Sequence, residues 1–323
     1  MPTKTARVVS IDAFRGFTMI AMLFANLEGG VFYPWFTHAR TIPGFTFVDL
    51  IEPMFFLAIA LSYMISFQAR ESKFGTSQAV WSTVSRYLAL MGLGFLTSWG
   101  DRFGFDFNWG TLQGIGLAGL CALPFVKTKP RTKLIAGLAL VLLPGILFFF
   151  GEPAAVDFKG ETSVPGLIAS VFPVNDNMVG AVIKAGMLLV GIAWAQLLTE
   201  NKKKAYIVFG GIALFAAGSL LAPSMWYLGP STMSPSYCLV SLALSFSVYL
   251  LFRFLFDNRG LPCAPLLWWG RNSLLMYVIS EVIGIGMAFG QTVPARLAFI
   301  TAYVALMTLT VWLLDRKRWY VKL

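Results

Sequence analysis

Long apolar runs separated by short polar stretches make up most of the chain. A transmembrane α-helix needs roughly 20 predominantly apolar residues, and each run approaches that length. The pattern therefore predicts an all-α integral membrane protein, a polytopic bundle of about ten transmembrane helices. The expected helices cover residues 11–28, 47–67, 80–99, 109–126, 134–150, 179–198, 205–222, 236–256, 266–285 and 296–314.

Loops poor in Lys and Arg alternate with loops rich in them. The poor loops are 29–46, 100–108, 151–178, 223–235 and 286–295. Because Lys and Arg accumulate in cytoplasmic loops, this asymmetry predicts multi-pass insertion into the cell (inner) membrane with both termini in the cytoplasm. Of the 25 basic residues, those on or near the predicted outer side are Arg40, Arg102, Lys159, Lys184 and Arg296.

Composition extends the membrane prediction to the whole chain. Of the 323 residues, 57% are hydrophobic and 12% are charged, about half the charged share of soluble domains. We expect a single transmembrane domain over residues 1–323, surrounded by membrane lipids. It comprises a motif region at 7–67, later spans at 80–314 and a cytoplasmic tail at 315–323. The net charge of +10 is divided among short clusters between apolar runs, which argues against nucleic acid as a partner.

The histidine and cysteine content restricts metal chemistry. His38 is the only histidine, so a multi-histidine metal site or a bis-histidine haem is excluded within one chain. Cys121, Cys238 and Cys263 show neither disulfide nor metal-ligand spacing. We therefore expect buried thiols and no metal.

Polar residues flank the first two expected helices. Asp12 and Arg15 share one helix face, where they either form an anchoring ion pair or meet an anionic ligand. Thr46 and Asp49 fit a variant capping box at the start of the second helix. Asp49 and Glu52 also share a face near membrane depth, where ionisable groups either pair or serve function. The sequence leaves both alternatives open.

His38 lies in the loop between these two helices, close in sequence to Asn26, Arg40 and Asp49. Histidine titrates near neutral pH when unperturbed. A general base for an amine or hydroxyl nucleophile needs such a pKa. His38 is therefore a candidate catalytic residue.

Further polar side chains interrupt the later apolar runs. Lys184 lies early in the run 179–198, where it either snorkels outward, pairs with Asp176 or contacts substrate. The run 266–285 carries more polar groups than a purely structural membrane helix. These polar groups are Arg271, Asn272, Tyr277 and Glu281. We predict that they line a cavity.

Gly114, Gly116 and Gly119 match the G-x-G-x-x-G pattern of dinucleotide-binding loops. That pattern must follow a strand and open a helix, whereas here it lies inside an apolar run. Small residues let membrane helices approach closely. We therefore interpret the glycines as a helix-packing surface.

Several stretches, taken in order, resemble one family. They are Ser10-Ile-Asp12-Ala-Phe-Arg15-Gly16, Asn26 with Gly29-Gly30, His38-Ala, Thr46-Phe-Val-Asp49-Leu-Ile-Glu-Pro53, Leu112-Gln113-Gly-Ile-Gly116, and Gly270-Arg271-Asn272-Ser273-Leu274 with Tyr277 and Glu281. Together they resemble heparan-alpha-glucosaminide N-acetyltransferase and its bacterial relatives, most strongly over residues 7–67. The chain departs from the family at Gly114, where relatives commonly have arginine, and at Arg40-Thr-Ile-Pro-Gly44, where they tend to have Trp-Asn-Gly.

The resemblance implies a transmembrane acyltransferase-like fold and an enzyme that uses acetyl-CoA as co-substrate. It would move the acetyl group from the cytoplasm to a glycan, glycolipid or other cell-envelope acceptor on the outer side, and it can form a homodimer. By motif position, the catalytic residues are His38, Asn26 and Asp49. Our candidates for binding the donor are Arg15, Arg86, Gln113, Arg271 and Asn272, since guanidinium groups suit phosphates. Our candidates for binding the acceptor are Arg40, Glu52, Lys184, Tyr277 and Glu281.

Two mechanisms and one alternative function remain open. His38 either takes a proton from the acceptor or carries the acetyl group covalently. Asn26 either orients the imidazole or donates to the developing oxyanion, and Asp49 can fix the histidine tautomer. A multi-span transporter or flippase without covalent chemistry would explain the spans and the intramembrane charges equally well. Binding of acetyl-CoA to the purified protein discriminates between the two functions.

Overall fold

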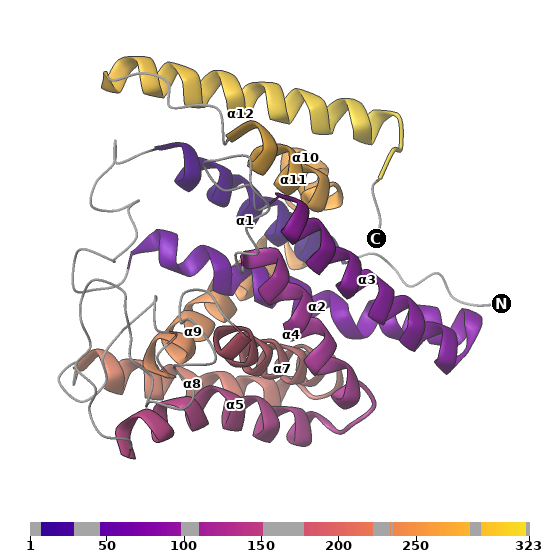
Figure 1. The fold of residues 1–323 in the computed structure, drawn as a ribbon, viewed down its shortest axis with the longest axis vertical. Coiled ribbons are helices and arrows are strands. Elements are labelled where there is room, and N and C mark those ends of the chain that lie inside the picture. The colour runs from indigo at the N-terminus through magenta and orange to yellow at the C-terminus, as the bar shows by residue number, and fades with distance from the viewer. Residues whose placement is uncertain are drawn as a thin grey trace. The chain divides into compact units, whose positions relative to one another are not determined.

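The computed structural model describes residues 8–28, 46–97, 110–150, 178–221, 233, 235–284 and 292–320. Within these ranges the chain forms eleven α-helices and no strand (Figure 1). The helices are α1 (Val9–Glu28), α2 (Phe47–Phe74), α3 (Thr76–Thr97), α4 (Thr111–Ala122), α5 (Pro130–Phe150), α7 (Met178–Glu200), α8 (Lys202–Leu221), α9 (Pro235–Phe252), α10 (Ala264–Arg271), α11 (Ser273–Gly284) and α12 (Val293–Arg316). Two short segments of other helix types join them, η1 (Leu123–Phe125) and the π-helical η2 (Arg253–Asn258).

Each apolar run of the sequence forms a helix, but the run 266–285 forms two. The expectation of one continuous helix there was wrong, because α10 ends and α11 begins at Asn272. Asn272 has left the helical conformation, with φ −115° and ψ 24°. Its carbonyl accepts a hydrogen bond from the Met276 N–H at 3.0 Å, which opens α11. Asparagine favours such helix ends because its side chain competes for backbone hydrogen bonds.

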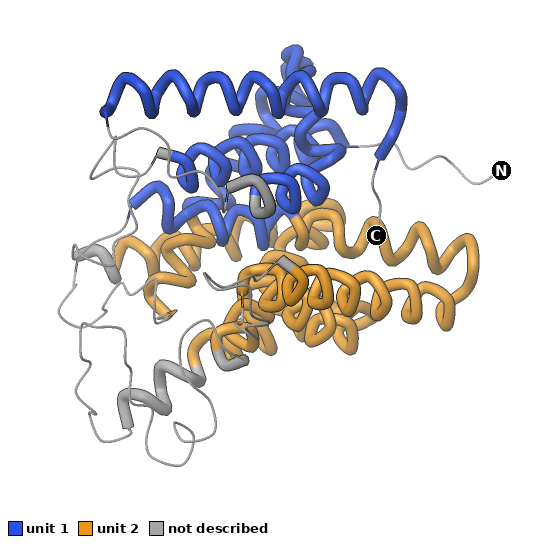
Figure 2. The backbone as a smooth tube through the Cα atoms, turned by 45° about the horizontal axis from the view of Figure 1, so that its top comes forward, with its two compact units in different colours: residues 1–58, 244–322 blue, residues 59–243, 323 orange. Residues whose placement is uncertain are grey.

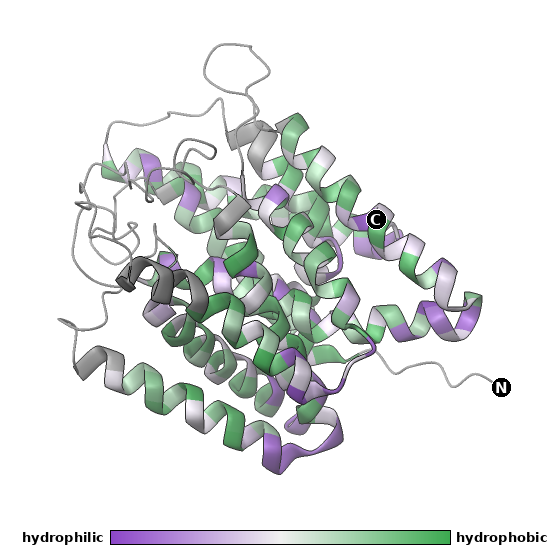
Figure 3. Cartoon of the chain, turned by 60° about the horizontal axis from the view of Figure 1, so that its bottom comes forward, coloured by the Kyte–Doolittle hydropathy of each residue, from purple (hydrophilic) through white to green (hydrophobic). Residues whose placement is uncertain are grey.

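Five helical segments of the described chain are long and apolar enough to cross a membrane. They are Phe47–Phe74, Thr76–Leu96, Gly180–Glu200, Pro235–Asn258 and Val293–Arg316. Apolar residues run along the helices, and hydrophilic ones gather near several helix ends (Figure 3). On α12, the side chains of Leu306, Leu309 and Leu313 are exposed, as lipid-facing residues are. The chain is therefore a membrane protein, while the number of spans and the orientation of the termini stay predictions.

The chain divides into two compact units (Figure 2). Unit 1 comprises residues 1–58 and 244–322. In unit 1, α1 packs against α10, α11, α12 and η2. Phe14 of α1 is fully buried and meets the rings of Tyr249 and Phe252 edge-on, each at 5.6 Å between centroids. This packing places the polar residues of α1 and α10 in one region.

Unit 2 comprises residues 59–243 with residue 323. Here α7 packs against α4, α5 and α8, and α3 packs against α4. Gly137 of α5 and Gly186 of α7 bring two backbones together, since a Cβ on either would lie 2.8 Å from the carbonyl oxygen of the other. Trp194 of α7 is fully buried and donates through Nε1 to the Ala205 carbonyl at 3.2 Å. These contacts make α7 the central helix of unit 2.

Candidate functional site

Two glycines set the distance between α1 and α10 in unit 1. A Cβ on Gly16 would collide with the carbonyl oxygen of Leu266, and a Cβ on Gly270 with that of Asp12. The two helices therefore cross with their backbones in contact. This crossing places Asp12 and its helical neighbour Arg15 beside the end of α10 that carries Arg271.

Four charged side chains form what we term the α1–α10 charge cluster: Asp12, Arg15, Arg271 and Asp315. The Arg15 guanidinium lies 3.7 Å from the Asp12 carboxylate, and that of Arg271 lies 2.8 Å from the Asp315 carboxylate. Asp12 also acts electrostatically on Arg271. Opposite charges thus alternate through the cluster. The ion-pair alternative for Asp12 and Arg15 is observed, and Arg271 has a carboxylate partner that sequence reasoning missed.

Asn272 follows the charge cluster directly and has an unusual environment. Its side chain is 1% exposed, yet neither Oδ1 nor Nδ2 has a hydrogen-bond partner among the described residues. The buried Nε of Arg271 and the hydroxyl of Tyr303 are likewise unpartnered there. A buried polar group without a partner costs about 1–3 kcal/mol. Two of these residues, Arg271 and Asn272, are adjacent at the helix break and offer unpartnered groups to a polar ligand.

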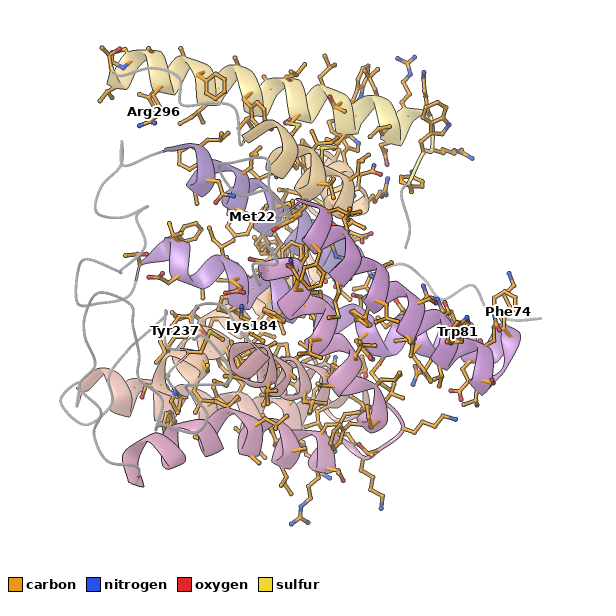
Figure 4. The ribbon with its side chains drawn as sticks, viewed as in Figure 1. Met22, Phe74, Trp81, Lys184, Tyr237 and Arg296 are labelled. Carbon is orange, nitrogen blue, oxygen red and sulfur yellow. The ribbon has the colours of Figure 1, made fainter. Side chains whose placement is uncertain are left out.

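Gln113 and Lys184 lie in unit 2, where α4 meets α7. Gln113 is 1% exposed and its Oε1 accepts from the Gly110 N–H at 3.1 Å, which caps α4. Lys184, which is labelled in Figure 4, is 4% exposed. Its side chain lies along Gly114, because a Cβ there would be 3.4 Å from the Lys184 Cδ and 3.5 Å from Nζ. The structure thus places the buried Lys184 side chain, on a candidate membrane span, against the residue that follows Gln113.

The other two glycines of the G-x-G-x-x-G stretch pack against α3. A Cβ on Gly116 would lie 2.8 Å from the Tyr87 carbonyl oxygen, and a Cβ on Gly119 would collide with the Tyr87 ring. The Tyr63 hydroxyl donates to the Gly119 carbonyl at 2.8 Å, and its ring stacks on Tyr87. The interpretation of these glycines as a packing surface is confirmed.

A sequence model of one family matches residues 7–206 of the chain. Its description is Heparan-alpha-glucosaminide N-acetyltransferase, catalytic. The chain belongs to this family. The resemblance seen in the sequence motifs is thereby confirmed, and the chain is assigned to the membrane acetyltransferases. A search of curated proteins found no match.

The match to the acetyltransferase family includes the segment with the predicted catalytic residues. Asn26 is exposed on the last turns of α1. Asp49 is 4% exposed, and its Oδ2 accepts from the Thr46 N–H at 3.1 Å and from the Thr46 hydroxyl at 2.9 Å. The capping prediction for Asp49 is therefore observed. His38 and Arg40 lie outside the described residues.

The remaining predicted residues of the acetyltransferase are spread over three helices. Glu52 is half-buried on α2, and Tyr277 is 9% exposed on α11. Glu281 belongs to α11, but its side chain lies outside the described part. Arg86 lies on α3 with its guanidinium 5.9 Å from the centroid of the Tyr87 ring. It is about 12 Å along the helix axis from Gly94, which packs on Gln113, so Arg86 does not join Gln113.

Sequence reasoning missed two carboxylates of this acetyltransferase. Asp257 of η2 binds Ser10 at the start of α1, and Asp315 of α12 binds Arg271. Each directly follows an apolar run in the sequence, and a carboxylate at that position indicates a polar contact at the end of the helix. Among the described residues, no group of three or more His, Cys, Asp or Glu side chains is placed to hold a metal ion.

Proposed function

We propose that this acetyltransferase transfers an acetyl group from acetyl-CoA, held at the cytoplasmic side, to an amino sugar or another cell-envelope acceptor on the outer side. The observation that carries the proposal is the family match over residues 7–206, which includes His38 and its neighbours Asn26 and Asp49. The proposal includes both termini in the cytoplasm, insertion into the cell (inner) membrane, and a single transmembrane domain that can form a homodimer.

Asn272 supports a role in binding the donor. The pantetheine arm of acetyl-CoA contains secondary amides, each with one donor and one acceptor. A carboxamide whose Oδ1 and Nδ2 are both unpartnered within the described chain can pair with such an amide on both sides. The adjacent Arg271 directs Nη1 to Asp315 and leaves its buried Nε available. Arg15, Arg86 and Gln113 complete the proposed donor contacts.

Lys184 supports a second substrate contact. Relatives commonly carry an arginine at the position of Gly114, and here the Lys184 ammonium lies beside that glycine. A cation from α7 thus occupies the region that an arginine of α4 would occupy. Lys184, together with Arg40, Glu52, Tyr277 and Glu281, is proposed to bind the acceptor.

His38 would act either as a general base or as a covalent carrier of the acetyl group. As a base, its imidazole takes the proton of the acceptor amine or hydroxyl while that atom attacks the thioester carbon, and the CoA thiolate leaves and is protonated. As a carrier, an imidazole nitrogen itself attacks the thioester carbon and displaces CoA, and the acceptor then takes the acetyl group from the histidine. Asn26 would orient the imidazole or donate to the oxyanion.

Acetyl transfer by the purified chain tests the proposal. The assay uses acetyl-labelled acetyl-CoA with glucosamine as the probe acceptor, in nanodiscs, and compares wild type with His38→Ala. We expect His38→Ala to lower the rate by about 10²–10⁴-fold, as loss of a general base does, with an unchanged melting temperature. Activity of the variant within a few-fold of wild type would remove His38 from the chemistry. Absence of both acetyl-CoA binding and transfer in wild type would favour the transporter alternative.

A further inference from the structure

The hairpin of α2 and α3 in unit 2 contains a pocket outside the proposed site. A single residue, Gly75, joins the two helices, and its φ of +84° is one that glycine adopts without strain. The pocket has a volume of about 120 Å³ and is lined by Arg70, Phe74, Gln78 and Ser82. It is smaller than the ~300–1,000 Å³ clefts that hold drug-sized ligands. Its size suits a small anionic group.

Arg70 lines this pocket, and the charge of a second arginine, Arg86, acts on it. Arg86 follows Gln78 and Ser82 at helical spacing on the same face of α3, and its charge acts on Arg70. Among the described residues no salt bridge joins Arg70 or Arg86 to a carboxylate. The two like charges therefore repel each other, and a bound anion would relieve that repulsion.

The nearest acidic residue of the hairpin is already paired. The Glu71 carboxylate lies 2.6 Å from the Lys127 ammonium, and its Oε1 accepts from the Thr76 hydroxyl at 2.7 Å. Lys127 also donates to the Thr76 hydroxyl at 3.0 Å. Glu71 is thus engaged with Lys127, and the charge of the pocket remains positive.

Exposed aromatic side chains place the pocket at the level of lipid headgroups. Phe74 is 59% exposed and Trp81 is 65% exposed, both at the same end of the α2–α3 hairpin (Figure 4). Lys73 lies 4.9 Å from the centroid of the Phe74 ring. Aromatic residues with adjacent basic residues are typical of membrane interfaces. Phosphate groups of lipids and of soluble nucleotides both reach this level.

We propose that the α2–α3 pocket binds a phosphate group through Arg70 and Arg86, with Gln78 and Ser82 as hydrogen-bond donors. Guanidinium groups bind phosphate oxygens in pairs of parallel hydrogen bonds. The phosphate belongs either to an anionic lipid headgroup or to the nucleotide of the acyl donor, and the second source rests on the proposed function. Arg70, Gln78 and Ser82 are new to the site, whereas Arg86 is already a proposed donor contact.

Two ligands and three variants test the pocket. The full chain is purified in nanodiscs of phosphatidylcholine, and binding is measured for CoA by calorimetry and for added phosphatidylglycerol by native mass spectrometry. Arg70→Gln removes one guanidinium. Gln78→Glu places a carboxylate in the pocket at an exposed position, where we expect folding to be unaffected. Arg131→Gln is the matched control, because Arg131 is an exposed arginine of α5 in the same unit.

We expect Arg70→Gln and Gln78→Glu to weaken the binding of one of the two ligands by about tenfold or more, as loss of a charged hydrogen bond does. Arg131→Gln should leave the affinity for both ligands nearly unchanged. Weakening of phosphatidylglycerol alone identifies a lipid site, and weakening of CoA alone identifies a nucleotide site. Equal effects of the pocket variants and the control on both ligands overturn the proposal. A wild type that transfers acetyl groups while both pocket variants bind normally refutes the pocket and leaves the proposed function intact. Lipid binding that depends on Arg70, in a wild type that transfers no acetyl group, refutes the proposed function and leaves the pocket intact.

Discussion

The carboxylate of Asp257 binds Ser10 at the first turn of α1. Oδ1 accepts from the Ser10 N–H at 3.0 Å, and Oδ2 accepts from the Ser10 hydroxyl at 2.6 Å. The first N–H groups of a helix have no partner within the helix, and a negative charge there is favourable. Asp257 therefore caps α1 from a segment 247 residues away in the sequence.

Loss of this cap should destabilise unit 1. We expect Ser10→Ala to lower the free energy of unfolding by about 0.5–2 kcal/mol, and Asp257→Ala by more, since the Ser10 N–H then loses its acceptor as well. The measurement is unfolding of the purified protein in detergent. Ser72→Ala is the control, because the Ser72 hydroxyl is exposed and donates only to the Ala69 carbonyl. Equal effects at Ser10 and Ser72 would contradict the capping role.

The backbone contact between α1 and α10 should make Gly16 and Gly270 intolerant of a methyl group. Gly270→Ala forces a Cβ against the Asp12 carbonyl oxygen, and overpacking of this kind costs about 1–3 kcal/mol. Gly211→Ala on α8 is the matched control, because the space around that glycine is open. Alanine favours a helix over glycine by up to about 1 kcal/mol, so the control should be neutral or stabilising. A Gly270→Ala variant as stable as Gly211→Ala would disprove the close crossing.

Two of the three glycines of α4, Gly114 and Gly116, should differ in their tolerance of a methyl group. Gly116→Ala brings a Cβ within 2.8 Å of the Tyr87 carbonyl oxygen, whereas Gly114→Ala reaches only 3.4 Å from the Lys184 side chain. We expect Gly116→Ala to cost about 1–3 kcal/mol and Gly114→Ala to stay within about 1 kcal/mol of wild type. Thermal unfolding of both variants gives the comparison. The opposite ranking would show that α4 packs through a different face.

Asn272 offers a test that separates a structural from a ligand-binding role. Asn272→Leu removes two polar atoms that have no partner within the described chain. Replacing such groups by an apolar side chain of similar shape is neutral or stabilising. We therefore expect an unchanged or raised melting temperature together with a KM for acetyl-CoA raised about tenfold or more. A destabilised variant with an unchanged KM would assign Asn272 to the helix break alone.

The positions of the helices could be predicted because lipid imposes a strict rule on the chain. Each crossing needs roughly 20 apolar residues, so the runs mark the helices directly. The break at Asn272 could not be seen this way, because the apolar pattern resumes at Leu274 directly after three polar residues, and such a short interruption does not end an apolar run. The pairs that could be predicted were local, such as Asp12 with Arg15 and Thr46 with Asp49.

The partners at long sequence separation could not be predicted. Asp257 and Ser10 are 247 residues apart in the sequence, so no local pattern joins them. Lys184 was expected to snorkel, to pair or to bind substrate, and its burial against Gly114 depends on how α4 and α7 cross. Such contacts are set by the packing of whole helices, which no local pattern of one chain encodes.

The one-residue connection at Gly75 restricts how the length of this chain can vary. Each residue inserted there would rotate α3 by about 100° and shift it by about 1.5 Å. Gln78, Ser82 and Arg86 would then turn away from Arg70, and Tyr87 would lose its stack on Tyr63. Surface connections usually tolerate insertions, but the length of this connection fixes the register between α2 and α3.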